Sequence, residues 1–108
     1  MIKAISLEEN IKALLKNKEY NIAISSLKKE IVNLFVIKIK QKDSTYTYTN
    51  ILNLIDKSEK VLNSKYNTQL KKYYCLSKEE YCEEYEIYQL LDIYSKIRKW
   101  KNDFWLFN

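Results

Sequence analysis

The residues that most resemble a catalytic or metal-binding cluster are four glutamates: Glu79, Glu80, Glu83 and Glu84. On a helix, residues four apart are neighbours, so these carboxylates would form two pairs able to hold a divalent cation. The alternative is a solvated helix start, where carboxylates suit the positive end of the helix dipole. The chain has no histidine, which a di-metal bundle site with Glu-x-x-His pairs would need. The composition therefore favours the solvated helix start.

The absence of histidine and glycine excludes several kinds of chemistry. Cys–His and Ser–His nucleophiles both need a histidine, and phosphate-binding loops need glycine. Cys75 and Cys82 lie about 10 Å apart on a continuous helix, too far for a disulfide unless the helix breaks between them. We expect both thiols to be reduced, and two thiols supply half of a zinc site. The sequence therefore predicts no enzyme activity, metal or cofactor.

Cations and aromatic residues are mixed near the carboxyl end of the chain. The candidate nucleic-acid patch comprises Lys96, Arg98, Lys99, Trp100 and Lys101. Such a patch can stack bases and bind phosphates, or rest on a membrane surface. The alternative is a helix end whose lysines extend into water. The net charge of +5 allows a nucleic-acid partner, but Arg98 is the only arginine, and arginine is the better phosphate ligand.

These residues need elements to position them, and the composition favours helices. The chain has neither glycine nor proline, which serve tight turns and end helices. Hydrophobic periodicity predicts one all-α domain over residues 1–108, an up-and-down bundle of four to five helices. The helices are predicted at residues 7–16, 20–41, 51–63, 64–76 and 78–100, with a polar loop at 41–49.

Capping residues set the expected starts of three helices. Ser6 with Glu9 and Ser77 with Glu80 form capping boxes, which begin the first and the last helix. Thr47 or Thr49 is expected to cap the third helix. Leu27, Ile31 and Leu34 are predicted core residues of the second helix, on one apolar stripe.

Some apolar side chains fall outside that stripe. Ile37 and Ile39 give the second helix another apolar face, and the chain ends in a run of large apolar residues. A helix that is apolar on two sides usually lies between neighbours. The candidate partner interface therefore comprises Ile37, Ile39, Phe104, Trp105, Leu106 and Phe107. The final four either fold back on the bundle or meet a partner.

Residues 11–34 (IKALLKNKEYNIAISSLKKEIVNL) resemble the first two helices of HEPN-domain proteins. The likeness lies in Leu14-Leu15, in Tyr20 within the polar turn, and in the Ala23-Ile24 step into a long second helix. It continues through the polar loop, the third helix and the aromatic-rich last helix. Catalytic members use an Arg-x(4–6)-His motif, which this chain lacks. The resemblance thus implies a non-catalytic member, often dimeric or paired with a nucleotidyltransferase or another protein of a toxin–antitoxin or defence system.

Three functions remain as alternatives. The first is a non-enzymatic, HEPN-like protein-interaction module that forms a homodimer or binds a hetero-partner. The second is a nucleic-acid-binding protein that uses the candidate patch. The third is an enzyme that uses tyrosine, lysine or carboxylates, although nothing in the sequence brings these groups together. The first ten residues lack the apolar run of a secretion signal, and no apolar stretch is long enough to span a bilayer, so we expect a cytoplasmic protein.

Overall fold

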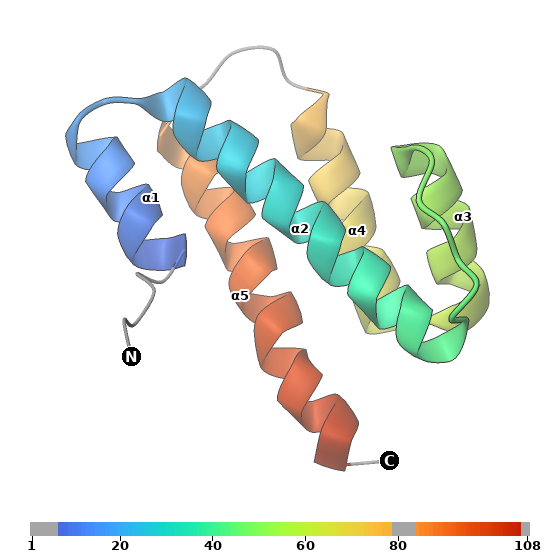
Figure 1. The fold of residues 1–108 in the computed structure, drawn as a ribbon. Helices are drawn as coiled ribbons and strands as arrows, with labels where there is room; N and C mark the ends of the chain where they lie inside the picture. Colours follow the sequence, from blue (N-terminus) through green and yellow to red (C-terminus); the bar gives the residue numbers. More distant parts are fainter. Residues whose placement is uncertain (1–6, 79–83, 107–108) are drawn as a thin grey trace.

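The computed structural model confirms an all-α helical bundle and describes residues 7–78 and 84–106, with side chains for 7–78 and 84–99. No strand occurs among these residues. Five helices follow one another along the chain (Figure 1): α1 (Leu7–Lys16), α2 (Tyr20–Lys42), α3 (Ile51–Val61), α4 (Ser64–Ser77) and α5 (Glu84–Leu106). Within the described residues, no helix has the apolar length needed to cross a membrane.

Helix α2 is the centre of the bundle. It packs against α1, α3 and, most extensively, α5, while α4 packs against α3 and α5. Its buried stripe repeats every three to four residues, as a helix with one face in the core requires. The stripe consists of Ala23, Ile24, Leu27, Ile31, Phe35, Lys38 and Ile39. Leu27 and Ile31 are thus core residues as predicted, whereas Leu34 is partly buried at the margin of the core.

The segment between α2 and α3 runs back along α3, so α2 and α3 point the same way (Figure 1). Contacts along this segment show the antiparallel course, because Asp43 reaches Lys57 and Tyr46 reaches Asn53. The segment is extended but pairs with no strand within the described chain, in agreement with the predicted loop.

The turn from α1 to α2 places a lysine in a backbone conformation that glycine usually adopts. Lys18 has a φ of 59°, in the left-handed region. The Glu19 amide donates to the Leu14 carbonyl at 2.8 Å, and the Lys18 amide donates to the Leu15 carbonyl at 3.0 Å. These two bonds form a Schellman motif, which ends α1 and turns the chain into α2.

Two predicted caps are wrong. Asn50, rather than Thr47 or Thr49, caps α3, because its side chain accepts a hydrogen bond from the Asn53 amide at 2.9 Å. Ser77 is the last residue of α4, and its hydroxyl donates to the Tyr74 carbonyl at 2.8 Å. It therefore helps to end one helix rather than to begin the next. Ser6 and Glu80 lie outside the described residues.

One lysine belongs to the core stripe of α2. Lys38 is buried along its length, and its Nζ lies 5.2 Å from the centre of the Tyr66 ring on α4. A cation over an aromatic face is attracted by the ring quadrupole. The stem of Lys38 contributes apolar area to the stripe, while the ring helps to accommodate its charge.

Candidate binding groove

A surface groove of about 440 Å³ lies where α2, the loop before α3 and α4 meet. It is open to solvent on one side, and its size is within the range of roughly 300–1,000 Å³ that is usual for ligand pockets. Seven residues line this groove: Lys28, Lys29, Val32, Asn33, Val36, Tyr48 and Tyr73.

Helix α2 supplies five of these residues from the face beside its core stripe. Val32 and Val36 are one turn apart and lie on the same side of the helix. Both are half-buried and pack against the core, so they form an apolar floor. Lys29 and Asn33, also one turn apart, lie further toward solvent and form the rim together with Lys28.

Tyr73 contributes the part of the groove that comes from α4. Its side chain is only 5% exposed, and its hydroxyl donates a long hydrogen bond of 3.5 Å to the Lys28 carbonyl. Burial raises the pKa of the Tyr73 phenol to about 12, with a smaller contribution from Tyr48. In the same region, Lys28 Nζ donates to the Ser77 carbonyl at 3.5 Å, near the negative end of α4. These two contacts connect α2 to α4 beside the groove.

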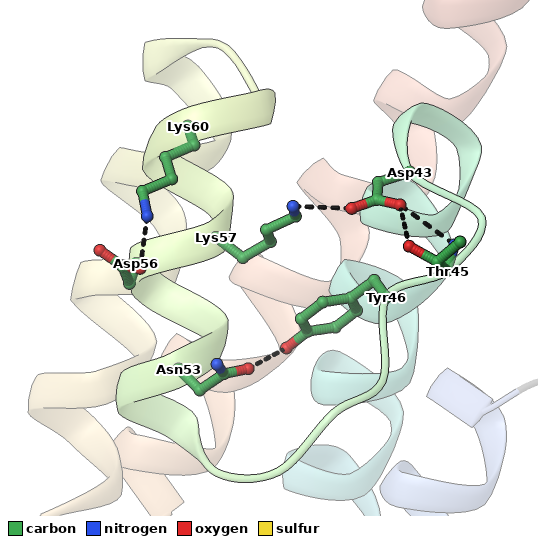
Figure 2. A network of polar contacts seen from close by, with 7 residues as sticks. All are labelled: Asp43, Thr45, Tyr46, Asn53, Asp56, Lys57 and Lys60. Atoms are coloured by element: carbon green, nitrogen blue, oxygen red, sulfur yellow. Dashed lines mark hydrogen bonds and ion pairs between the residues drawn. The ribbon is translucent and has the colours of Figure 1, made fainter.

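Tyr48 reaches the groove from the loop, and polar contacts fix the first half of that loop to α3. Figure 2 shows Asp43 between Lys57 and Thr45, with Tyr46 pointing toward Asn53. The Asp43 carboxylate lies 2.7 Å from Lys57 Nζ and accepts hydrogen bonds from the Thr45 hydroxyl at 2.6 Å and amide at 3.1 Å. Hydrogen bonds from Lys57 and Thr45 lower the pKa of Asp43 to about 2.

Tyr46 and Tyr48, two residues apart on the extended loop, differ in burial. Tyr46 is buried, and its hydroxyl donates to Asn53 Oδ1 at 2.9 Å. Burial raises the pKa of Tyr46. Tyr48 is 39% exposed and borders the groove. The buried and hydrogen-bonded Tyr46 therefore anchors the loop two residues before Tyr48.

The chemistry of this groove suits binding. Its floor is aliphatic and aromatic, its rim carries two ammonium groups and one amide, and none of the residues described along it is a carboxylate. An anionic group with an apolar neighbour would satisfy both parts of this surface.

The predicted partner interface is divided by the structure. Ile37 is 46% exposed, one turn beyond Asn33 on the outward face of α2, whereas Ile39 is 0% exposed in the core. The prediction for Ile39 is therefore wrong, because adjacent helix residues differ by 100° in direction and Ile39 falls on the buried stripe. Phe104, Trp105 and Leu106 lie in α5, but their side chains are outside the described set, as is all of Phe107.

Two cations of the predicted basic patch form ion pairs with neighbouring carboxylates. Lys96 pairs with Asp92 at 3.0 Å. Arg98 pairs with Glu8 at 3.7 Å, and its guanidinium donates to the Tyr94 hydroxyl at 3.3 Å. Lys99 is exposed, and the side chains of Trp100 and Lys101 lie outside the described set.

The predicted acidic cluster falls mostly outside the described residues, which exclude Glu79, Glu80 and Glu83. Glu84 begins α5 and accepts a hydrogen bond from the Tyr88 hydroxyl at 3.3 Å. Over the part of the chain that the structure describes, no three histidine, cysteine or acidic side chains gather as metal ligands would. Cys75 carries an exposed free thiol, and Cys82 is not described.

Sequence reasoning missed the groove because its residues come from three separate segments. Val32 and Val36 were detectable as an apolar pair beside the core stripe. Nothing in the sequence indicated that Tyr73 and Tyr48 converge on α2.

Comparison of this chain with protein-family models, curated proteins and solved structures finds no match.

Proposed function

We propose that this chain is a non-enzymatic helical module that acts by binding another protein. The observation that carries the proposal is the groove along α2, which places Val32, Val36 and Tyr48 at the surface. Ile37 is exposed one turn beyond Asn33, outside the rim of the groove. An apolar patch that a polar rim surrounds is typical of a protein-interaction site.

The resemblance to HEPN-domain proteins is part of this proposal. The order of the first helices supports it, with Tyr20 half-buried at the start of α2 and Ala23 and Ile24 buried one turn later. The catalytic motif of that family needs a histidine, which this chain lacks. Its only arginine, Arg98, already contacts Glu8 and Tyr94. The missing histidine and the contacts of Arg98 are both consistent with a non-catalytic family member that forms a homodimer or binds a hetero-partner.

The nucleic-acid alternative has less support. Lys96 and Arg98, which the proposed patch would need for phosphate contacts, already form ion pairs: Lys96 with Asp92, which Lys72 shares, and Arg98 with Glu8. We therefore place the main binding surface on α2 rather than on α5.

Site-specific cross-linking in living cells tests this assignment. A photoreactive benzophenone amino acid replaces Ile37 in one variant and Asn10, an exposed residue of α1, in the control. We expect a defined protein adduct from position 37 that position 10 does not form. The same adducts from both positions, or none from position 37, would contradict the proposal.

Light scattering on a sizing column identifies the kind of partner. A mass near twice the 13.1 kDa of one chain would indicate a homodimer, and Ile37→Glu should then return it to a single chain. A monomeric wild type would assign the adduct at position 37 to a different protein.

A further inference from the structure

We infer that the partner segment in this groove is acidic, with a large apolar side chain set against Val32, Val36 and Tyr48 and carboxylates beside it that face Lys28 and Lys29. This inference rests on the proposed function and adds the chemistry of the partner. It concerns a different chain, because a second copy would bring a net charge of +5 to a rim that is already positive.

The floor of the groove determines the apolar part of the partner. Val32 and Val36 are half-buried, and Tyr73 is almost fully buried beneath the surface. The hydroxyl of Tyr73 is directed to the Lys28 carbonyl, so its polar atom already has a protein partner. An apolar side chain that enters the groove would therefore cover mainly carbon atoms, which is favourable.

The rim determines the charge of the partner. Lys28 Nζ directs one of its three donors to the Ser77 carbonyl, which holds the ammonium across the α2–α4 boundary. Lys29 is exposed next to it, and the Asn33 side chain adds an amide one turn further along α2. Carboxylates would complement both lysines, whereas a basic segment would be repelled.

The loop supplies the third wall in a prearranged position. Asp43 is tied to Lys57 at 2.7 Å and Tyr46 to Asn53 at 2.9 Å, so α3 anchors the chain just before Tyr48. A wall that is already ordered lowers the entropic cost of binding. The paired valines also favour a peptide over a nucleic acid, since single strands bind by stacking successive bases on aromatic rings and tracking cations along the backbone.

Three synthetic probes distinguish the components of this inference: the acetylated hexapeptides DELWED, KKLWKK and DESSED. Titrations followed by amide chemical shifts measure each dissociation constant and locate the binding site. We expect DELWED to bind at least about tenfold more tightly than either of the other two, a ratio that corresponds to 1.4 kcal/mol. The largest shifts are expected at Val32, Val36 and Tyr48.

Charge reversal provides the second test. Lys29→Glu changes an exposed side chain and leaves the Lys28–Ser77 contact in place, so the fold should be retained. We expect it to weaken DELWED binding about tenfold, and Lys28→Glu/Lys29→Glu to reverse the preference between DELWED and KKLWKK. The matched control is Lys12→Glu/Lys16→Glu on α1, two exposed lysines outside the groove, which should leave both constants unchanged.

Four outcomes would overturn the inference. DELWED could show no binding at millimolar concentration, or the same affinity as KKLWKK. The Lys12→Glu/Lys16→Glu control could lose as much DELWED affinity as Lys29→Glu, or a single-stranded hexanucleotide could bind more tightly at the same amides. If position 37 still formed its protein adduct in cells, the proposed function would stand and only the acidic partner would be rejected. If position 37 formed no adduct in cells and DELWED did not bind, the interaction module would be rejected as well.

Discussion

At the scale of single residues, a few polar side chains determine where the loop before α3 lies. Asp43 combines an ion pair to Lys57 with two hydrogen bonds from Thr45, and these contacts favour the charged carboxylate. Its pKa is lowered from 3.8 to about 2. Because the folded protein binds this proton less readily than the unfolded chain, the contribution of Asp43 to stability is complete above about pH 4 and is lost as the pH falls toward 2.

Replacing Asp43 by asparagine should remove this contribution to the pH dependence of stability. We expect Asp43→Asn to lower the melting temperature at pH 7 and to flatten the decline between pH 4 and 2, because the group that titrates there is gone. Thermal melts followed by circular dichroism across this range measure both effects. The matched control is Asp56→Asn, whose ion pair to Lys60 at 3.2 Å lies on the exposed face of α3 (Figure 2). An equal loss in both variants would show that Asp43 has no special role in holding the loop.

At the scale of elements, the turn between α1 and α2 carries a conformational cost. Lys18 occupies the left-handed position at which a Schellman motif usually has glycine. Its Cβ makes this conformation unfavourable by roughly 1–2 kcal/mol. The chain tolerates this because two backbone hydrogen bonds and the packing of α1 on α2 hold the turn closed.

Glycine at this position should therefore stabilise the protein. We expect Lys18→Gly to raise the free energy of unfolding by about 0.5–1 kcal/mol, the relief of the left-handed strain less the greater freedom that glycine gives the unfolded chain. Urea denaturation measures the difference. The control is Lys12→Gly, an exposed position in the middle of α1, which should lower stability by about 0.5–1 kcal/mol, since glycine is unfavourable in a helix interior. If Lys18→Gly were less stable than the wild type, the lysine side chain would stabilise the fold by more than its left-handed backbone conformation destabilises it.

At the scale of the whole molecule, the core depends on α2, which packs against α1, α3 and α5. Leu27 is 0% exposed in the centre of the buried stripe, whereas Leu52 on α3 is 61% exposed. The same chemical change at these two positions therefore compares a core leucine with a surface leucine.

We expect Leu27→Ala to lower the free energy of unfolding by about 2–5 kcal/mol, through lost burial and the cavity that remains. Leu52→Ala should change it by less than about 0.5 kcal/mol, as is typical of surface positions. Urea denaturation of both variants under identical conditions measures the contrast. A loss below about 0.5 kcal/mol for Leu27→Ala would place this residue outside the core.

Most of the fold was predictable because it depends on local patterns. The stripe through Leu27 and Ile31 predicted α2 and its buried face, since a helix repeats every 3.6 residues whatever its neighbours are. The cap of α3 was not predictable, because Thr47, Thr49 and Asn50 are all suitable caps and only the path of the loop selects Asn50. Ile39 was wrongly assigned to a partner interface. Apolar residues surround it in the sequence, so the pattern did not show which of them faces the core.

The sequence by itself determined the helices, their buried stripes and the exclusion of histidine chemistry, because these follow from residue types and from spacing within a few turns. Only the tertiary structure decided which surface is available for binding. The groove needs Val32 of α2, Tyr48 of the loop and Tyr73 of α4 at one place, and these residues are far apart in the chain. Their convergence depends on how the helices pack and on the contacts of Asp43 and Tyr46 that fix the loop to α3.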